Sequence, residues 1–483
     1  MKFLFLGTHY PGHVNTCSNF VAASPRGAAI TAKVRNMSLL DLSRIFKAYD
    51  VRGVYPDDIN ETVAERLGAA FAAFVKAPKV IVGRDMRLSS PALAAAFIHG
   101  VTGQGTGVVD VGEVSSDALY FASGKLDAPG AMFTASHNPP RYNGVKMCLA
   151  GAAPIGQDTG LADIRRLAET ELAPAPASGT VESLDVVEDF ASHVLSFVKA
   201  EDIPPSTIVV DAANGMAGKM VPPLFRRLPV RLVPLYFELD GSFPNHPADP
   251  IQIDNLKDLR KTVLDEKADI GLAFDGDADR VFLVDEKAEP VSGSLTTALV
   301  AVRILARNPG APIVHNLICS RIVPETIIAN GGTPIRSRVG HSFIKQIMAE
   351  TGAAFGGEHS GHYYFRDNFR ADSGMIASMF VLEALASEGK PLSEVLAPYR
   401  KYWNSGERNS EVADPTAKLK ELAEVYADAK IDWLDGLTVD YPDWWFNARP
   451  SNTEPLLRLN VEATTAELGE ARTAELLARI AAR

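Results

Sequence analysis

Residues 275–280 read Asp-Gly-Asp-Ala-Asp-Arg, so carboxylates occur at alternate positions. In an extended segment alternate side chains point to the same face, and Asp275, Asp277 and Asp279 should therefore converge. Two such charges about 4 Å apart repel each other by about 4 kcal/mol at an effective dielectric constant of about 20. A divalent cation relieves that repulsion, and ligands that are all oxygen atoms favour Mg²⁺. The spacing therefore predicts a magnesium site.

A calcium loop of the EF-hand type is the rival interpretation of the same residues. The three aspartates and Glu286 match its positions 1, 3, 5 and 12. The turn at position 6 requires Gly, and this chain has Arg280 there. Residues 282–284, Phe-Leu-Val, indicate a strand, whereas an EF-hand needs a helix on each side. These departures favour magnesium, and a non-catalytic calcium-binding protein remains the alternative from a different functional class.

A second polar stretch, residues 133–146, contains Ser136 between a short residue and a His-Asn pair. Pro139 and Pro140 follow, and two prolines prevent a helix or a strand from continuing. The prolines also lower the entropy cost of ordering a loop. We therefore expect Ser136 on a fixed loop with its hydroxyl exposed to a ligand. An ordinary surface turn is the alternative, because Ser, Asn, Pro and Gly are common turn residues.

Two further stretches combine hydrogen-bonding side chains with flexible backbone. Residues 449–453, Arg-Pro-Ser-Asn-Thr, offer a guanidinium, two hydroxyls, an amide and backbone N–H groups, which together suit a phosphate. Residues 356–362, Gly-Gly-Glu-His-Ser-Gly-His, offer the mixed donors and acceptors that sugar hydroxyls need. Each stretch alone also fits an ordinary polar loop or tight turn.

The elements around these stretches follow an α/β pattern in which short apolar strands alternate with helices. A predicted Ala-rich helix at 61–76 precedes a strand at 79–83 and a Ser-capped helix at about 90–100. The pattern recurs, which implies sheets covered by helices on both faces. The C-terminal part differs and reads as a small α+β domain that ends in a helix. Further strands are predicted at 207–211, 269–274, 312–316, 436–440, 444–448 and 456–461.

The predicted fold class is α/β, with three similar α/β domains of mixed sheets between helices and a smaller C-terminal α+β domain. A Pro-rich linker at 173–179 and composition changes near 286–293 and 401–410 suggest the boundaries. Residues 1–38 show no period and are predicted to be a disordered extension, or sequence upstream of a natural start at Met37. The four domains are placed at 39–180, 181–290, 291–402 and 403–483.

Composition narrows the possible partners and the compartment. The formal net charge of −11 argues against nucleic acid or an anionic membrane surface as a partner. Three scattered cysteines are too few for a disulfide framework, and a reducing cytoplasm fits best. No run reaches the 18 or so apolar residues of a membrane span. The apolar run near residue 4 is too short for the core of a signal peptide.

Taken together, four of these stretches resemble the signatures of the α-D-phosphohexomutase family, and within it those of the bacterial phosphomannomutase/phosphoglucomutase type. They are Thr-Ala-Ser-His-Asn-Pro-Pro at 134–140, Asp-Gly-Asp-Ala-Asp-Arg at 275–280, Gly-Glu-His-Ser-Gly-His at 357–362 and Arg-Pro-Ser-Asn-Thr at 449–453. Their order and spacing match, and the resemblance covers about residues 39–483. It implies four domains around a central cleft.

The resemblance also implies a role for individual residues. Ser136 corresponds to the phosphoserine of the family, and Asp275, Asp277 and Asp279 hold Mg²⁺ against its phosphate. The residues that contact the substrate or assist proton transfer are expected to be Arg52, Lys146, Arg280 and His341. Tyr49 is expected to bind the substrate, and the sugar is expected to contact Glu358, Ser360 and His362. The substrate phosphate is expected to contact Arg449, Ser451, Asn452 and Thr453.

The activity that the resemblance implies is intramolecular phosphoryl transfer between mannose 6-phosphate and mannose 1-phosphate through a hexose 1,6-bisphosphate. Glucose 1,6-bisphosphate or mannose 1,6-bisphosphate would be the activator, and hexose phosphates the only partners of a monomer or weak homodimer. Phosphoglucomutase and a dual-specificity enzyme are the nearest alternatives. Ile318 stands where many dual-specificity relatives have Lys, which puts turnover of glucose phosphates in doubt.

Overall fold

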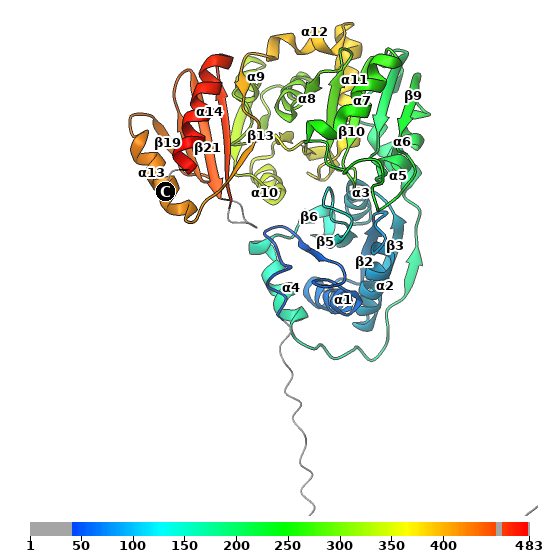
Figure 1. Ribbon diagram of the computed structural model, residues 1–483. Helices are drawn as coiled ribbons and strands as arrows, with labels where there is room; N and C mark the ends of the chain where they lie inside the picture. The colour runs from blue at the N-terminus through cyan, green and yellow to red at the C-terminus, as the bar shows by residue number, and fades with distance from the viewer. Residues whose placement is uncertain (1–40, 451–455, 482–483) are drawn as a thin grey trace, which may run out of the picture. The chain divides into compact units, whose positions relative to one another are not determined.

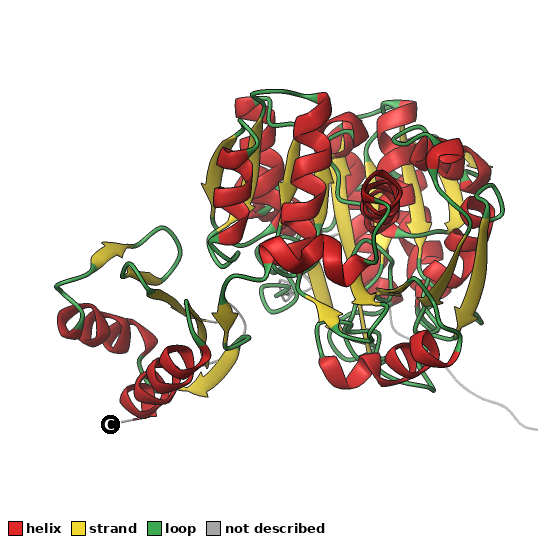
Figure 2. Cartoon of the chain, turned by 90° about the horizontal axis from the view of Figure 1, so that it is seen from above, coloured by secondary structure: helices red, strands yellow, loops and turns green. Residues whose placement is uncertain are grey.

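The computed structural model describes residues 41–450 and 456–481 (Figure 1). The predicted disordered extension at 1–38 lies outside the described residues. Four β-sheets organise the described chain. Figure 2 shows helices on both faces of the strands, and three α/β domains with mixed sheets are followed by a C-terminal domain. The predicted fold class is confirmed.

The first three domains repeat one strand arrangement. Three strands form a parallel core in which the first lies between the second and the third, and a fourth strand pairs antiparallel with the third. The four strands are, in chain order, β2 (Lys79–Arg84), β3 (Gly107–Glu113), β4 (Gly130–Phe133) and β5 (Tyr142–Leu149); β8 (Ser206–Asp211), β9 (Val230–Leu235), β10 (Ile270–Phe274) and β11 (Val281–Asp285); and β13 (Pro312–Asn316), β14 (Thr333–Ser337), β15 (Phe355–Gly357) and β16 (Tyr363–Phe365).

Short strands extend the first two sheets at their edges. In the first sheet β7 pairs in parallel with β3, so this sheet continues beyond residue 180. The additional strands are β1 (Val51–Val54), β6 (Ala153–Pro154), β7 (Val181–Ser183) and β12 (Pro290–Val291). The helices of the three domains are α1 (Glu61–Val75), α2 (Ser90–Gly103), α3 (Ser116–Leu126), α4 (Leu161–Ala168), α5 (Val187–Leu195), α6 (Ala217–Phe225), α7 (Lys257–Asp265), α8 (Gly293–Arg307), α9 (Ile322–Ala329), α10 (His341–Thr351), α11 (Gly374–Glu388) and α12 (Leu392–Leu396).

The fourth domain has an antiparallel sheet and two helices, α13 and α14, which is the predicted α+β arrangement. Its apolar face is covered because Leu422 and Leu476 pack from the helices onto the sheet. Its elements are β17 (Trp403–Asn404), β18 (Arg408–Glu411), α13 (Pro415–Val425), β19 (Lys430–Asp432), β20 (Leu437–Asp440), β21 (Trp444–Pro450), β22 (Leu456–Ala463) and α14 (Ala466–Ala481).

The polar stretches of the first three domains occupy the same place in the repeated arrangement. The serine loop (residues 134–141) joins β4 to β5, the aspartate loop (275–280) joins β10 to β11, and the glutamate loop (358–362) joins β15 to β16. Each is therefore the connection from the last parallel strand to its antiparallel neighbour. The fold thus presents chemically different loops from equivalent positions.

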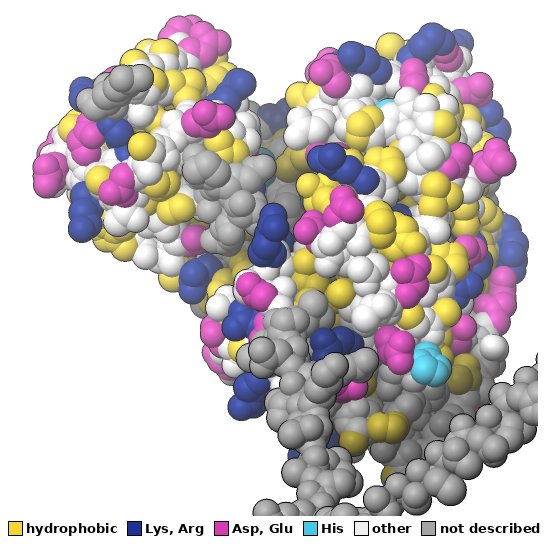
Figure 3. Space-filling view, turned by 60° about the horizontal axis from the view of Figure 1, so that its bottom comes forward, with side chains coloured by type: hydrophobic (Ala, Val, Ile, Leu, Met, Phe, Trp, Pro, Cys, Tyr) yellow, Lys and Arg dark blue, Asp and Glu magenta, His cyan; other side chains and the backbone are white. Residues whose placement is uncertain are grey.

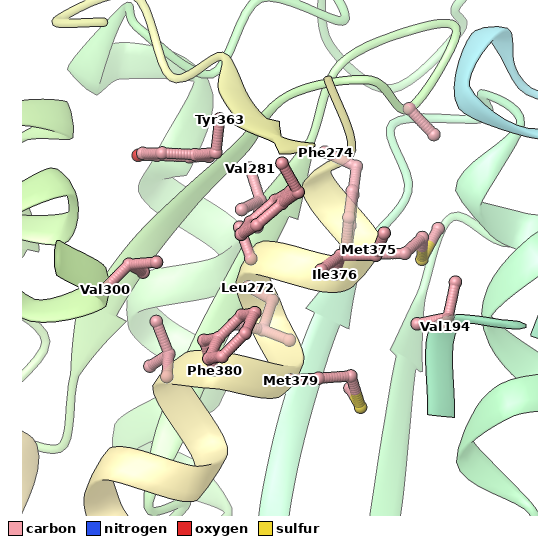
Figure 4. Packing of buried hydrophobic residues seen from close by; sticks show 14 of the residues in the cluster. Val194, Leu272, Phe274, Val281, Val300, Tyr363, Met375, Ile376, Met379 and Phe380 are labelled. Carbon is pink, nitrogen blue, oxygen red and sulfur yellow. The ribbon is translucent and has the colours of Figure 1, made fainter. Parts of the chain in front are cut away.

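Buried apolar side chains fix both ends of the aspartate loop. Phe274 precedes the loop and Val281 follows it, and the two side chains are 1% and 0% exposed. Both belong to the same core cluster as Met375 and Ile376 of α11, and Figure 4 shows this packing. Burial of each such side chain contributes about 1.5–3 kcal/mol. The strand β11 after the loop also confirms that an EF-hand helix is absent at this place.

The predicted serine cap of α2 is wrong. The helix begins at Ser90, as expected, but Ser89 makes no capping hydrogen bond. Instead, the Ser89 hydroxyl accepts from Asn143 Nδ2 at 2.8 Å, and the Ser90 hydroxyl donates to Asp85 Oδ1 at 2.6 Å. These buried contacts replace the cap because they satisfy polar groups that would otherwise be buried without partners.

Within the described residues, no helix is both long and apolar enough to cross a membrane. Cys148 and Cys319 are buried free thiols. On the face shown in Figure 3, the Lys and Arg side chains are interspersed with Asp and Glu side chains. A functional anion site must therefore be built from local groups, which the loops provide.

Candidate active site

The serine loop meets the aspartate loop at van der Waals distance. Ser136 has a positive φ of 49°, which is uncommon for a residue with a side chain. Its hydroxyl donates to Asp275 Oδ2 at 2.7 Å. Gly276 makes this approach possible, because a Cβ there would lie 2.4 Å from the Ser136 carbonyl oxygen. The two predicted stretches therefore form one site, although Ser136 and Asp275 lie 139 residues apart in the sequence.

Arg87, which was not predicted as a site residue, anchors the serine loop through the backbone carbonyl groups of the loop. Its guanidinium is fully buried and donates to the carbonyl oxygens of Ser136 and Asn138, each at 2.7 Å. It also donates to the carbonyl oxygens of Pro139 and Tyr142, each at 3.0 Å. Asp85 balances the charge, with its Oδ2 at 3.2 Å from Arg87 Nε. The sequence signal was Asp-Met-Arg directly after a strand.

The three aspartates converge as predicted. Their carboxylate oxygens lie within 4.8 Å of one another, and each side chain is buried. Lys146 Nζ lies 2.7 Å from Asp277 Oδ2 and 2.6 Å from Asp279 Oδ2. Among the described residues, Oδ1 of Asp277 and Oδ1 of Asp279 have no hydrogen-bond partner. Buried carboxylate oxygens without donors fit a divalent cation, because an unsatisfied buried acceptor costs free energy.

Arg280 joins the aspartate loop to the serine. Its Nε donates to Asp275 Oδ2 at 2.9 Å, and its Nη2 donates to Ser136 Oγ at 3.1 Å. Nη2 also contacts His137 Nδ1. Burial and the neighbouring Arg280 charge hold the pKa of His137 well below its ordinary value. The imidazole is therefore neutral, which lets Nδ1 accept a hydrogen bond from the guanidinium.

The carboxylates of this cluster differ in proton affinity. Burial, with the charges of Asp277 and Asp279, raises the pKa of Asp275 despite the nearby Arg280. Burial acts in the same direction on Asp277, but Lys146 outweighs it and holds the pKa of that carboxyl low. The lysine correspondingly has a raised pKa: burial would lower it, but Asp277 and Asp279 outweigh burial. A buried cation is therefore already part of the acidic cluster.

The glutamate loop presents a fixed carboxylate. Glu358 is 2% exposed, and its Oε1 accepts from the Tyr364 hydroxyl. Its Oε2 accepts from Asn316 Nδ2 at 3.0 Å and from Gly340 N at 3.3 Å. These donors orient the carboxylate without a full ion pair. Such an oxygen pair can accept from hydroxyl groups of a ligand.

The same loop reaches the aspartate loop through His362. The hydroxyl of Ser360 lies 3.0 Å from His362 Nδ1, and His362 Nε2 lies 3.7 Å from Asp279 Oδ1. The backbone of the two loops also pairs at Arg280 and His362. Asp279, His362 and Asp372 form a second group whose atoms lie close enough for a metal ion. Asp279 belongs to both groups.

Three predicted residues of the first and third domains lie around this cluster. Arg52 Nη1 donates to Asn138 Oδ1 at 2.6 Å, so it contacts the serine loop. The rings of Tyr49 and His341 are 5.2 Å apart. Burial and the charge of Lys345 hold the pKa of His341 well below its ordinary value. His341 is therefore neutral in the ordinary pH range.

The fourth domain contributes two arginines that converge on one carboxylate. Arg449 Nη2 lies 2.9 Å from Glu407 Oε2, and Arg458 Nη1 lies 3.4 Å from Glu407 Oε1. The two arginines face each other on β21 and β22. Two guanidinium groups around one anion form a geometry suited to phosphate. The other predicted residues of this loop, Ser451, Asn452 and Thr453, lie outside the described residues.

Buried charged pairs that the sequence analysis did not identify support the site. Lys345 Nζ and Asp372 Oδ1 are 2.8 Å apart, and both side chains are almost fully buried. Asp117, also fully buried, accepts from Ser373 Oγ at 2.6 Å and from the Ser115 hydroxyl. The contact between Asp117 and Ser373 joins the first domain to the third. All of these contacts depend on tertiary pairing, for which no local sequence pattern is diagnostic.

Comparison with known proteins identifies the class of multidomain enzyme to which this fold and this group of side chains belong. Profiles of phosphoglucomutase/phosphomannomutase alpha/beta/alpha domains I, II and III match residues 43–174, 188–289 and 292–402. The C-terminal domain profile of the same family matches residues 407–482. The chain belongs to the phosphoglucomutase/phosphomannomutase family, and it is accordingly an isomerase.

Individual relatives extend over nearly the whole chain. A phosphomannomutase of Salmonella montevideo is 39% identical over 445 residues, which covers 89% of this chain and 98% of the relative. A protein of Xanthomonas campestris pv. campestris called phosphohexose mutases is 40% identical over 438 residues, with the same coverage of 89% and 98%. A crystal structure of a phosphoglucomutase/phosphomannomutase family protein from Burkholderia thailandensis has a TM-score of 0.82 at 35% identity, covering 91% of this chain and 97% of that one.

Proposed function

We propose that the protein interconverts mannose 6-phosphate and mannose 1-phosphate through a phosphorylated Ser136 and a hexose 1,6-bisphosphate. The observation that carries the proposal is the convergence of the Ser136 hydroxyl, the aspartate cluster, Lys146 and Arg280. Phosphoserine carries about −1.5 to −2 charges, so a site that accepts it needs nearby cations. Lys146 and Arg280 are such cations, and Arg52 contacts Asn138 of the serine loop.

Asp275, Asp277 and Asp279 would hold Mg²⁺, together with an oxygen of the phosphorylated Ser136. The ion supplies charge neutralisation for the transferring phosphoryl group. Two oxygens of the buried cluster, Oδ1 of Asp277 and Oδ1 of Asp279, accept no hydrogen bond from the described residues, which supports this assignment. The site residues and the domain boundaries 39–180, 181–290, 291–402 and 403–483 belong to the same proposal.

In the first step the phosphorus–oxygen bond to Ser136 breaks while a bond forms to a hydroxyl of the sugar phosphate. The hydroxyl proton leaves to a base, a role that the proposal gives to His341. A proton returns to Ser136 Oγ. Lys146 and Arg280 stabilise the charge that develops on the phosphoryl oxygens. The product of this step is the 1,6-bisphosphate.

The bisphosphate then turns within the site and returns its other phosphate to Ser136. The phosphate that does not react would be held by Arg449 with Ser451, Asn452 and Thr453. The sugar hydroxyls would contact Tyr49, Glu358, Ser360 and His362. Glucose 1,6-bisphosphate or mannose 1,6-bisphosphate would activate the enzyme by phosphorylating Ser136. Exclusion of water prevents hydrolysis of the phosphoserine.

The proposed preference for mannose rests on the relatives that are phosphomannomutases and on Ile318. Four curated relatives at 38–39% identity are phosphomannomutases. Ile318 is 8% exposed and lines a pocket with Ser294, Ser320 and His359, so a lysine contact is missing there. A dual-specificity enzyme is the alternative. The ratio of kcat/KM for mannose 1-phosphate to that for glucose 1-phosphate decides: a value well above one supports the proposal, and a value near one favours dual specificity.

The reaction class has its own test. The intact mass is measured before and after incubation with glucose 1,6-bisphosphate and Mg²⁺, and the modified peptide is mapped. We expect one added phosphoryl group on Ser136. A phosphoryl group on any other residue contradicts the mechanism.

We further propose that the enzyme acts on hexose phosphates in the cytoplasm as a monomer or weak homodimer. It would have no nucleic acid or membrane partner, which the net charge of −11 supports.

A further inference from the structure

The backbone of Val339, two residues before His341, is held by two other domains. Its N–H donates to Asp435 Oδ2 of the fourth domain at 3.0 Å. Its carbonyl oxygen accepts from the Tyr49 hydroxyl of the first domain at 2.9 Å. The strand β14 has already ended at Ser337, so these side chains take the place of sheet partners. One residue of the third domain thus connects three domains.

The next residue joins this connection to the glutamate loop. Gly340 N donates to Glu358 Oε2 at 3.3 Å. Gly340 has a φ of 134°, and a Cβ there would lie 2.4 Å from the Tyr49 hydroxyl oxygen. A side chain at this position would therefore separate Tyr49 from the segment. Movement of residues 339–340 must change the position of Glu358, of His341, or of both.

On the opposite side, Asp435 is tied to the strand that carries Arg449. The Asp435 carbonyl oxygen accepts from Asn447 Nδ2 at 3.0 Å. The next residue, Gly436, has a φ of 69°, and a Cβ there would lie 2.7 Å from Arg449 Cα. The turn at residues 435–436 therefore lies directly against Arg449. A shift of this arginine on phosphate binding would be transmitted to the Asp435 side chain.

Burial and nearby negative charge keep the Tyr49 hydroxyl protonated, so that it can donate a hydrogen bond. Burial, followed by the negative charges of Asp435 and Glu358, raises the pKa of Tyr49 to about 12. The phenol is therefore protonated throughout the neutral range and donates to Val339 O. Val339 is therefore held from both sides, by Asp435 at its N–H group and by Tyr49 at its carbonyl oxygen.

We infer that Asp435 is a positioning residue that couples the phosphate grip of Arg449 to the placement of Glu358 and His341 through the backbone of residues 339–340. The inference rests on the proposed function, because it assigns Arg449 to the phosphate and Glu358 to the sugar. When a hexose phosphate draws Arg449 into place, Asp435 fixes the amide of Val339, and the sugar contacts become ordered. Binding energy from the phosphate is thereby used at the sugar.

The kinetic test compares Asp435→Ala, Asp435→Asn and a matched control, Asp432→Ala. Asp432 lies in the same segment and pairs with Arg336 across the same two domains, but both side chains are about one third exposed. Alanine at 435 removes the acceptor, whereas asparagine keeps an oxygen for the Val339 N–H. Misplacement of reacting groups costs about 10- to 100-fold. We expect a loss of this size in kcat for Asp435→Ala, with near-normal rates for the other two variants.

Three kinetic outcomes overturn the inference. The first is a rate for Asp435→Ala within about twofold of the wild type, a margin of less than 1 kcal/mol. The second is an equal loss in Asp435→Ala and Asp432→Ala, which would reduce the effect to general adhesion between the domains. A change in KM alone, with kcat unaffected, also contradicts a role in placing the sugar.

Amide hydrogen exchange separates this inference from the proposed function. It is measured in the ligand-free protein on the peptide that contains residues 337–343. Faster exchange in Asp435→Ala, but not in Asp432→Ala, establishes the contact whether or not the enzyme turns over mannose phosphates. Unchanged exchange together with normal hexose phosphate turnover refutes the inference and leaves the proposed function standing. Altered exchange with no hexose phosphate turnover in the wild type refutes the proposed function, and with it the coupling role.

Discussion

Ser136 Oγ donates to Asp275 Oδ2 at 2.7 Å, although the two residues belong to different sheets and lie 139 positions apart. The contact places the hydroxyl at the edge of the acidic cluster, where Arg280 also reaches it at 3.1 Å. A serine with an acceptor on one side and a guanidinium on the other is held in one orientation. Substitutions in this cluster should therefore have distinct effects on activity and on stability.

Replacement of the serine separates chemistry from folding. Ser136→Ala removes the phosphoryl acceptor, and we expect mutase activity to fall by about 10⁴-fold or more. The lost hydrogen bond is worth about 1 kcal/mol, so the midpoint of thermal unfolding should move by about 4 °C or less. Coupled assays and circular dichroism measure the two quantities. Ser242→Ala, at an exposed serine, is the control and should retain full activity; substantial turnover in Ser136→Ala would exclude a phosphoserine at this position.

Removal of the Lys146 ammonium group from the acidic cluster should destabilise the folded protein. Lys146→Met leaves Asp277 and Asp279 buried without their lysine, and breaking a buried pair in this way costs about 3–5 kcal/mol. Chemical denaturation in EDTA measures the loss. Mg²⁺ should restore part of it, because an ion that binds only the folded state stabilises that state. Lys125→Met is the control: its pair with Asp189 is about half exposed and contributes about 1 kcal/mol or less. Equal losses for the two variants would contradict this account.

The stability of the protein should depend on pH through Asp117. Burial raises the pKa of this carboxyl to about 7, so the folded protein keeps a proton that the unfolded chain has lost above about pH 4. Stability should therefore fall as pH rises from about 4 to 7, by about 1 kcal/mol per pH unit from this group. Asp117→Asn should flatten the profile measured by urea unfolding. Asp158→Asn, at an exposed residue, should leave the profile unchanged; an unaltered slope in Asp117→Asn would refute the assignment.

The phosphate contact in the fourth domain predicts a binding defect. Arg449→Lys keeps the charge but loses the planar fork, which matters at a bidentate phosphate contact. We expect KM for the hexose phosphate to rise about 10-fold, equivalent to about 1.4 kcal/mol. Steady-state kinetics measure this change. Arg408→Lys, at an exposed arginine of β18, is the matched control; a normal KM in Arg449→Lys would remove the arginine from the phosphate site.

Local patterns were sufficient to predict the aspartate loop and most of its scaffold. Alternating carboxylates after the apolar residues 270–274 predicted a converging cluster, and the cluster is present. The helix predicted at 61–76 extends from Glu61 to Val75 in the structure, because Asn60 caps its start and Lys76 adopts a left-handed conformation at its end. Periodicity and termination signals act over a few residues, so they can be read from the chain directly.

Contacts between distant segments could not be predicted in the same way. The clamp formed by Arg87 acts on backbone carbonyl groups, which every residue has, so the sequence of the serine loop does not identify its partner. The pair between Lys345 and Asp372 likewise depends on the third domain bringing α10 close to the segment between β16 and α11. The serine cap predicted for α2 is absent for a related reason, because the Ser89 hydroxyl accepts a hydrogen bond from Asn143 of β5 instead.

The recurrence of one loop position in three domains has a consequence for how such an enzyme can arise. A single ancestral unit of four strands, copied in tandem, would deliver three loop tips without any new topology. Each copy could then change in this loop alone while its sheet stayed intact. One loop could thus come to carry a nucleophile, another a cation site, and the third a binding site for hydroxyl groups.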